Sequence, residues 1–354
     1  MCVSRTESPR LTIVMPVFNH REQVRVMIDS IIANTYDDWE LLAVDDGSED
    51  DTLQLLADYE RKDQRVRLIK RQRMPKGAPT CRNIGMGEAR GEYIVFFDSD
   101  DYVAPYCLAG RVVAMDKRED LDFMVFPSGV YRDNTGLQTG PNPYAYGYPG
   151  LGDEAANFAR RFLPFIVWNN IYRAASLRYY KIRWDEQLLS LQDADFNVAT
   201  IIARLKFDYA LNTIKVKPDY GYRIGTSESV SKGISSERQF ESHVYATRKM
   251  YEMIRSAYGN KYDGALFSGV LLLYNRVMTG SGLNRHLAEM MVEGIRDLDP
   301  EKSRRLQGLV SITATLSRIL PSKIARQLPM LPYLLSNKTR RKRKLKVISA
   351  FPSQ

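Results

Sequence analysis

Residues 93–101, with the sequence YIVFFDSDD, decide the fold class because an apolar run ends there directly in acidic residues. Two earlier segments follow the same plan. LTIVMPVF at 11–18 is followed by Asn19, and ELLAV at 40–44 is followed by DDGS. Short continuous apolar runs rich in β-branched residues are typical of strands buried on both faces of a parallel sheet. We therefore predict three such strands, each ending in polar residues.

Helical patterns separate these runs. Apolar residues recur at helical spacing from Val24 to Ile32, and further helices are expected at 50–60 and 80–89, with strands at 66–69 and 123–126. Alternating strands and helices indicate right-handed crossovers. The prediction is an α/β fold with a mostly parallel central sheet flanked by helices, in which ligands bind beyond the carboxyl ends of the strands.

Composition limits the class of protein. The 354 residues are 44% hydrophobic, which is enough apolar material for a sizeable core. No apolar run approaches the length of a spanning helix, and no secretory signal pattern opens the chain. Cys2, Cys81 and Cys107 have no metal-ligand spacing, which favours a reducing compartment. We expect a cytoplasmic protein.

The positive charge is concentrated at the C-terminal end. Thirteen Lys or Arg and no Asp or Glu lie between Lys302 and Gln354, and seven of the thirteen fall within 338–346. Such a cluster attracts polyanions. Three roles for this cluster stay open. It could contact the anionic inner face of the cell membrane peripherally, form a plain solvated tail, or bind a nucleic-acid or protein partner. Nucleic acid is disfavoured, since no nucleic-acid-reading motif accompanies the charge.

The polar turns after the three strands, at 16–19, 45–48 and 98–101, should meet on one rim of the sheet. Taken alone, each turn has the residue types that are common in ordinary loops. Together they bring several carboxylates to one edge, where each close pair repels by roughly 1–4 kcal/mol near a surface. Carboxylate oxygens with room for water suit Mg²⁺ or Mn²⁺ bound jointly by phosphate oxygens. A metal-bound diphosphate is the expected ligand.

The ordered succession of PVFN at 16–19, VDDGS at 44–48, CRNIG at 81–85 and ARGEYIVFFDSDD at 89–101 resembles the family-2 glycosyltransferases of the GT-A fold. The resemblance covers about residues 10–105, with a looser continuation through 168–196 and 222–231. It implies an inverting, metal-dependent transfer of a sugar from a nucleotide-diphospho-sugar, such as a UDP-sugar, to a hydroxyl of a saccharide or lipid-linked acceptor, as in bacterial polysaccharide synthesis.

The resemblance also implies roles for individual residues. The metal ligands would be Asp100 and Asp98, holding Mn²⁺ or Mg²⁺, with Asp98 also towards the ribose and Asp101 as a helper or a helix cap. Arg82 could instead be an ordinary charge on a helix surface. The positions that correspond to the nucleotide-sugar site of the family are Pro16, Val17, Phe18, Asp45, Asp46, Arg82, Asp98 and Ser99.

Inverting members of the family use an acidic residue as the base that deprotonates the acceptor, usually the aspartate of a Glu-Asp pair. Here the corresponding segment is LQDADF at 191–196, so Gln192 replaces the expected glutamate. We assign the base to Asp193, with Asp195 as the alternative. Because aspartate is a favoured helix N-cap, a purely structural role for Asp193 is the competing interpretation.

Acceptor binding has weaker signals. Residues 128–152 contain six glycines, three prolines and four tyrosines, and are expected to form either a loop that closes over sugars or an Ω-loop packed on its own tyrosines. The resemblance places Trp168, Asn169 and Arg223 on the acceptor side, with Arg223 near Ser229 and Ser231.

Three regions follow from these patterns. We expect a GT-A domain at 1–235, a helical region at 236–336 that packs on it or mediates oligomers, and a polybasic tail at 337–354. A dinucleotide-binding oxidoreductase is excluded, because Arg90 stands where the third glycine of its fingerprint should be. A non-catalytic GT-A scaffold, recruited to an anionic membrane or another polyanion by its basic tail, remains open because Gln192 departs from the pattern.

Overall fold

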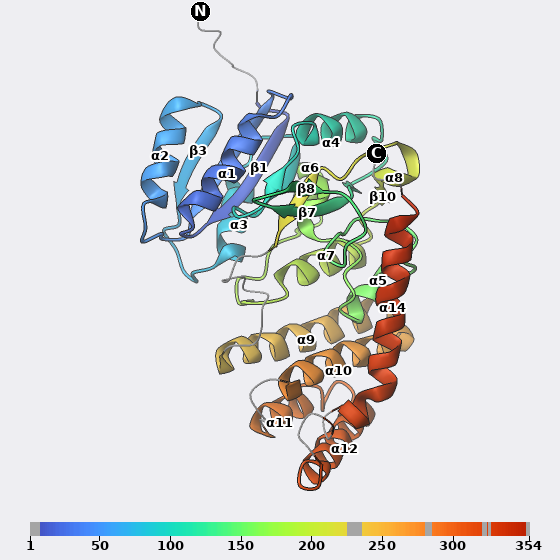
Figure 1. The fold of residues 1–354 in the computed structure, drawn as a ribbon. Coiled ribbons are helices and arrows are strands. Elements are labelled where there is room, and N and C mark those ends of the chain that lie inside the picture. Colours follow the sequence, from blue (N-terminus) through green and yellow to red (C-terminus); the bar gives the residue numbers. More distant parts are fainter. Residues whose placement is uncertain (1–7, 225–235, 280–284, 321–323, 325–326, 352–354) are drawn as a thin grey trace, which may run out of the picture.

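The computed structural model describes residues 8–224, 236–279, 285–320, 324 and 327–351. It has two parts. A central sheet flanked by helices forms the first part, and a helical extension lies at one end of it (Figure 1). The last helix, α14 (Leu331–Ser349), runs from the far end of the extension back to the first part (Figure 1).

The central sheet has seven strands in the order β10-β6-β9-β4-β1-β2-β3. All of its pairings are parallel except those of β9, which runs antiparallel to both β4 and β6. The predicted α/β class is confirmed, with this one antiparallel strand added. The strands are β1 (Leu11–Val17), β2 (Trp39–Asp45), β3 (Val66–Lys70), β4 (Tyr93–Phe96), β6 (Phe123–Val125), β9 (Asn170–Arg173) and β10 (Phe207–Tyr209).

The helices between these strands match the predicted spacing. Val24, Met27 and Ile28 are buried, as their helical periodicity requires. Gly85 lets α3 approach β1 closely, because a Cβ there would lie 2.4 Å from a methyl of Val14. The helices of this part are α1 (Arg21–Ile32), α2 (Thr52–Lys62), α3 (Ala78–Glu88), α4 (Cys107–Asp116), α5 (Glu154–Ala159), α6 (Ala174–Tyr179), α7 (Gln192–Ile202) and α8 (Ala210–Thr213).

A second sheet contains residues predicted as one irregular loop. The segment 128–152 opens with a hairpin of β7 (Ser128–Arg132) and β8 (Gly136–Gln138), and β7 pairs in parallel with β11 (Tyr220–Arg223). The loop prediction was therefore wrong for these residues, because their pairing partner lies about ninety residues later. The short β5 (Tyr102–Val103) completes the sheet in the order β5-β11-β7-β8.

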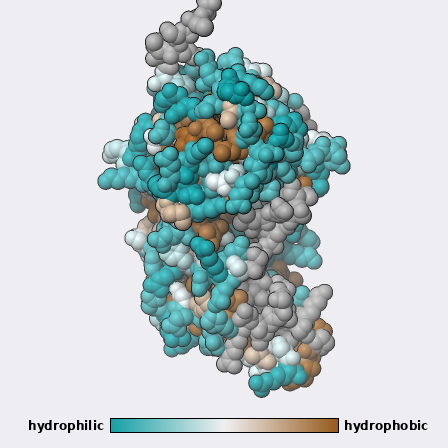
Figure 2. Space-filling view, turned by 90° about the vertical axis from the view of Figure 1, so that its left-hand side faces the viewer, coloured by the Kyte–Doolittle hydropathy of each residue, from teal (hydrophilic) through white to brown (hydrophobic). Residues whose placement is uncertain are grey.

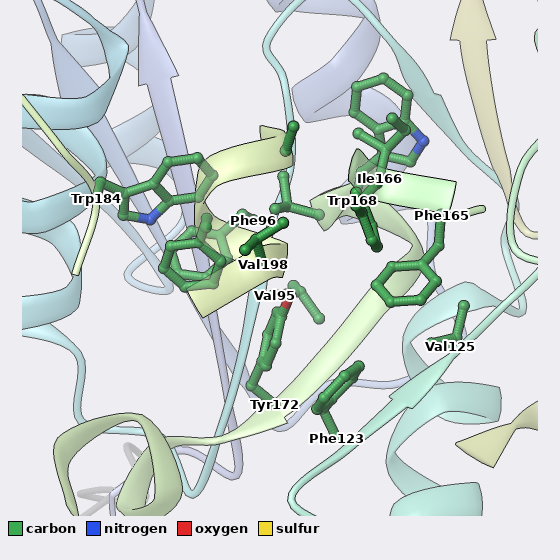
Figure 3. Packing of buried hydrophobic residues seen from close by; sticks show 14 of the residues in the cluster. Val95, Phe96, Phe123, Val125, Phe165, Ile166, Trp168, Tyr172, Trp184 and Val198 are labelled. Carbon is green, nitrogen blue, oxygen red and sulfur yellow. The ribbon is translucent and has the colours of Figure 1, made fainter. Parts of the chain in front are cut away.

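Aromatic packing connects the strands to α7 (Figure 3). Trp184 stacks on Phe196 with 4.3 Å between ring centroids. Phe96 meets both rings edge-on, at 5.2 and 5.4 Å. Because Phe96 belongs to β4 and Phe196 to α7, this cluster fixes the start of α7 relative to the end of β4.

The extension consists of helices throughout its described residues. Leu266, Val270 and Leu273 recur at helical spacing in α10 and are buried as one stripe. Among the helices of the described ranges, none combines the length and apolar character needed to cross a bilayer. The helices are α9 (Glu237–Tyr258), α10 (Asp263–Thr279), α11 (Arg285–Gly294), α12 (Pro300–Leu316) and α14.

The basic segment is not a separate tail in the structure. Residues 337–349 form the greater part of α14, and only 352–354 lie outside the described residues at this end. The Lys- and Arg-rich sequence retains good helix formers, and one side of the helix is buried against the first part of the molecule.

Candidate active site

The end of β4 meets α3 and α7 at a buried arginine. Arg82, on α3, forms an ion pair with Asp98 at 2.6 Å and donates to Oε1 of Gln192 at 3.1 Å. Its guanidinium also lies 4.4 Å from the ring centroid of Trp184. Only 4% of Arg82 is exposed, so the alternative of an ordinary surface charge is wrong. The contacts instead make Arg82 the positive centre of an acidic site.

Asp193 lies beside this ion pair at the start of α7. Among the described residues, its Oδ1 is buried without a hydrogen-bond partner. Burial raises the pKa of Asp193 to about 6, and the negative charge of Asp98 adds to the rise while Arg82 opposes it. The N-cap position of α7 is occupied by Leu191, which makes no side-chain cap. Asp193 therefore does not act as the helix cap, and its carboxylate is left available.

Asp195 has a different environment. Its carboxylate accepts from Lys249 at 2.9 Å, and the same ammonium bonds Asp185 at 2.7 Å. Lys249 comes from α9, so this ion-pair network joins the helical extension to α7. The carboxylate of Asp195, the alternative base, is thus already paired with a lysine, whereas Asp193, the first choice, is not bonded to that lysine.

The two aspartates that follow Ser99 diverge. Asp101 is buried and accepts from the Tyr220 hydroxyl at 2.6 Å and from the backbone N–H of Arg223 at 2.7 Å. It is an anchor of the turn. The Asp100 carboxylate reaches the surface, and desolvation by the surrounding protein, followed by the charge of Asp98, raises its pKa. A bound cation would therefore reduce the repulsion between the carboxylates of Asp98 and Asp100.

Arg223 holds this turn from the second sheet. Its Nε donates to the backbone oxygen of Asp100 at 2.6 Å, and its guanidinium pairs with Asp133. In this conformation Arg223 clamps the acidic turn, and its acceptor-side role stays a prediction. The nearby segment 225–231, which holds Ser229 and Ser231, lies outside the described residues.

The first two turns are joined to each other. The backbone N–H of Asn19 donates to Ser48 Oγ at 2.9 Å, and Asn19 Oδ1 accepts from the N–H of Glu49 at 2.8 Å. Because β1 pairs with both β2 and β4, all three turns lie on one edge of the sheet, as predicted. Of the three strand-end positions, Pro16 and Val17 are buried, and only Phe18 is exposed, with Lys76 Nζ 3.6 Å from its ring centroid.

The aspartates of the second turn already have protein partners. Asp45 accepts from the N–H groups of Gly47 and Ser48 and so shapes the turn. Asp46 pairs with Arg71 at 2.5 Å and accepts from the N–H of Gly77 at 3.1 Å. A nucleotide base bound by Asp46 would therefore share a carboxylate that Arg71 holds in place.

Aromatic side chains line the second sheet next to the acidic turn. Trp168 stacks on Tyr220 at 5.6 Å and on Tyr222 at 5.5 Å, and Tyr144 lies 6.1 Å from Tyr222. Asn169 is fully buried, with its amide bonded to the Phe126 carbonyl and to the Ile166 N–H. Asn169 therefore stabilises the turn and does not reach an acceptor in this conformation.

Comparison with known proteins identifies the family. The model of glycosyl transferase family 2 matches residues 12–198, just over half of the chain. The chain belongs to glycosyltransferase family 2. The matched span runs from the first strand through Asp193, so it includes every turn of the site just described.

Two relatives of this family-2 glycosyltransferase come from Bacillus subtilis strain 168. An uncharacterized glycosyltransferase, EpsJ, is 25% identical over 66% of this chain and 70% of its own length. A putative glycosyltransferase, EpsH, is 28% identical over 67% of this chain and 66% of its own length. These relatives support a glycosyltransferase enzyme.

A solved structure extends the likeness to nearly the whole fold. The crystal structure of S. aureus TarS 1-349 in complex with UDP-GlcNAc matches with a TM-score of 0.61 and 18% identity, over 94% of this chain and 92% of that one. At this identity the likeness shows the fold alone. The shared fold includes the helical extension as well as the GT-A part.

In this glycosyltransferase, the carboxylate oxygens after β4 are suitable ligands for a divalent ion that is shared with a substrate. In the described part of the chain, no three His, Cys, Asp or Glu side chains come together as a metal cluster. The exposed carboxylate of Asp100, with Asp98 beside it, offers one or two hard oxygen ligands. Mg²⁺ and similar ions are commonly held in this way, with phosphate and water completing the shell.

Sequence reasoning missed three residues of the site. Trp184 makes a cation–π contact with the guanidinium of Arg82, and Tyr220 donates a hydrogen bond to Asp101. Lys249 pairs with Asp195. Their partners lie 102, 119 and 54 positions away in the chain. No local motif marks such contacts. A lone lysine on an amphipathic helix carries no signal of a role in the site.

Proposed function

We propose that this chain is an inverting, metal-dependent transferase that moves a sugar from a nucleotide-diphospho-sugar, with UDP-sugars as the first candidates, to a hydroxyl of a saccharide or lipid-linked acceptor. The observation that carries the proposal is the unpaired Oδ1 of Asp193 beside the Arg82–Asp98 ion pair. A carboxylate with a raised pKa and an oxygen that no protein group hydrogen-bonds is suited to act as a general base.

In this mechanism Asp193 takes the proton of the acceptor hydroxyl as that oxygen attacks the anomeric carbon. Arg82 holds Asp98 in place through their ion pair, while Gln192 accepts a hydrogen bond from the same guanidinium. Asp100 and Asp98 would hold Mn²⁺ or Mg²⁺, which when bound stabilises the negative charge of the leaving diphosphate. Holding donor and acceptor in line supplies the remaining advantage.

The donor and acceptor classes rest on different observations. The fold shared with a protein solved with UDP-GlcNAc supports a UDP-sugar as the first donor to test. The partly exposed Tyr222, stacked on Trp168 and near the exposed Tyr144, supports a sugar-containing acceptor, because aromatic faces and hydroxyls bind sugar rings.

The decisive experiment measures donor use with and without Mn²⁺. Thermal stabilisation across a panel of nucleotide-sugars should identify a donor, and slow hydrolysis of that donor should then be detectable. Asp100→Asn should abolish the metal-dependent stabilisation. Asp193→Asn should retain donor binding but lower transfer by roughly 10²–10⁴-fold, the usual contribution of a general base.

The matched control is Asp120→Asn, which replaces an exposed aspartate that pairs with Arg118, away from the site. It should leave donor binding and transfer unchanged. Product with retained anomeric configuration would overturn the inverting mechanism. If no nucleotide-sugar stabilised the wild type with Mn²⁺ present, the proposed donor class would be rejected.

A further inference from the structure

Helix α14 has two faces of different character. Tyr333, Lys344 and Ile348 are buried and form the inner face. Five exposed residues, spaced three or four apart, lie along the opposite side of the helix and are here called the outer stripe. They are Leu331, Leu335, Lys338, Lys342 and Lys346. The stripe is therefore apolar in its first two turns and cationic in the turns that follow.

The inner face fixes α14 on the glycosyltransferase domain. Lys344 Nζ donates to the carbonyl of Pro143 at 3.0 Å and lies 3.7 Å from the ring centroid of Tyr146. Ile348 packs into a small apolar cluster with Ala145 and Tyr148. These contacts join the inner face of the helix to the segment at 143–148. The outer stripe therefore faces away from the glycosyltransferase domain.

The exposed aliphatic residues include the two leucines of the stripe and four residues that precede it in the chain. Among the described residues, all six exposed leucines and isoleucines lie between 312 and 335. They are Ile312, Ile319, Ile324, Leu328, Leu331 and Leu335. Hydrophobic surface is visible at the lower end of the molecule in Figure 2, the end at which α12 lies in Figure 1. Large aliphatic side chains concentrated in one region of a surface mark an interaction site.

We propose that the outer stripe and the aliphatic residues that precede it form a docking surface for an anionic lipid bilayer. The leucines and isoleucines would enter the boundary between headgroups and acyl chains, and the lysines would contact the anionic headgroups. The charge pattern favours a bilayer over a second copy of the chain. No Asp or Glu follows Glu301 in the sequence, so two copies meeting through this surface would bring like charges together.

The test compares two triple variants of the full chain with the same net charge. Lys338→Glu/Lys342→Glu/Lys346→Glu reverses the stripe. The control, Lys62→Glu/Lys117→Glu/Lys181→Glu, reverses three exposed lysines of the GT-A domain. Binding is measured by co-sedimentation with phosphatidylglycerol–phosphatidylcholine vesicles and with pure phosphatidylcholine vesicles. A third variant, Leu331→Ser/Leu335→Ser, tests the apolar part of the stripe, and thermal unfolding verifies that each protein is folded.

Wild type should bind the anionic vesicles and release them at high salt. The stripe reversal should lower the partition coefficient by roughly a hundredfold or more, because each basic residue near an anionic surface contributes about fivefold. The control variant should retain most of the binding, and the Leu331→Ser/Leu335→Ser variant should weaken it.

Equal losses in both triple variants would reveal a simple net-charge effect and overturn the proposal. Absence of wild-type binding to anionic vesicles would also overturn it. A concentration-dependent dimer that Leu331→Ser/Leu335→Ser dissociates, with no vesicle binding, would assign the surface to a second copy instead. Truncation at 337 is unsuitable, since it would also remove Lys344 and Ile348 from their packing sites. The outcome does not depend on the identity of the sugar donor.

Discussion

At the scale of single residues, the electrostatics of the site centre on Arg82. Its guanidinium faces two carboxylates, those of Asp98 and Asp193, and one neutral amide, that of Gln192. A glutamate in place of Gln192 would add a third negative charge beside the same cation. Because Gln192 is neutral, Arg82 can oppose the rise in the pKa of Asp193 more effectively.

The pH dependence of the reaction should report the titration of Asp193. As the general base, Asp193 must be deprotonated, so kcat/KM should be constant above its pKa of about 6 and fall tenfold per pH unit below it. A pH–rate profile at saturating Mn²⁺ measures this limb. A flat profile down to pH 4.5 would exclude Asp193 as the titrating base.

The substitution Gln192→Glu should move that acidic limb to higher pH. The added negative charge favours the protonated, neutral form of Asp193 and therefore raises its pKa. Gln192→Met is the matched control, since it removes the contact with Arg82 without adding a charge. An unchanged limb in Gln192→Glu, with the protein folded, would show that residue 192 does not influence the base.

At the scale of secondary-structure elements, α9 of the extension holds the first turn of α7. Lys249 bonds Asp195 and Asp185, Tyr245 donates to Asp185 at 3.0 Å, and Ser242 Oγ accepts from the backbone N–H of Leu189 at 2.9 Å. The extension is thus a structural part of the active site. It fixes the helix that carries Asp193.

Removing the cation of this network should destabilise the protein. Lys249→Met leaves two largely buried carboxylates without their partner, which should lower the free energy of unfolding by about 3 kcal/mol at pH 7. Urea unfolding measures the loss. Transfer activity should also fall, mainly through kcat, because Asp193 is displaced.

The neighbouring Arg248 provides the control. Its ion pairs with Asp297 and Glu252 are exposed, so Arg248→Met should have a much smaller effect on unfolding. Equal losses for the two variants would mean that the network at Lys249 contributes no more than a surface ion pair.

At the scale of the whole molecule, α14 closes the structure by returning to the GT-A part (Figure 1). Its docking contacts include Lys344 on Pro143 and Tyr146, and Ile348 in the cluster with Tyr148. Burial lowers the pKa of Lys344 to about 7, and the charge of Arg341 adds to the decrease. Because Ile348 is buried in this contact, a charged substitution there should weaken the docking of the helix.

Ile348→Asp should release α14 and expose its many basic residues to trypsin. Placing a carboxylate among Ala145 and Tyr148 without a partner is costly, so the population of the undocked helix should rise. We expect cleavage within 338–346 to accelerate by at least about tenfold, because proteolysis follows the open population. Mass spectrometry of the fragments gives the rate.

Ser349→Asp is the matched control for this variant. It adds the same charge one position further along, at an exposed residue, and should leave the rate near that of wild type. Similar acceleration in both variants would mean that Ile348 does not dock the helix.

The α/β class, the positions of β1 to β4 along the chain, and the meeting of three polar turns at one sheet edge could all be predicted from the amino-acid sequence. These features depend on local periodicity and on the rule that parallel strands end together. The same motifs indicated Arg82, Asp98 and Asp193, because the resemblance to the family is carried by short contiguous segments. The stripe of Leu266, Val270 and Leu273 was likewise visible as helical spacing.

Which carboxylate of the site is paired with which cation became clear from the folded arrangement of the chain. Asp193 and Asp195 are two positions apart on one helix, yet Lys249 neutralises only Asp195. The same holds for α14, where packing buries Lys344 and leaves Lys342 exposed. The physical reason is that ion pairing and burial depend on neighbours brought from distant positions of the chain, and no local pattern encodes which neighbour will arrive.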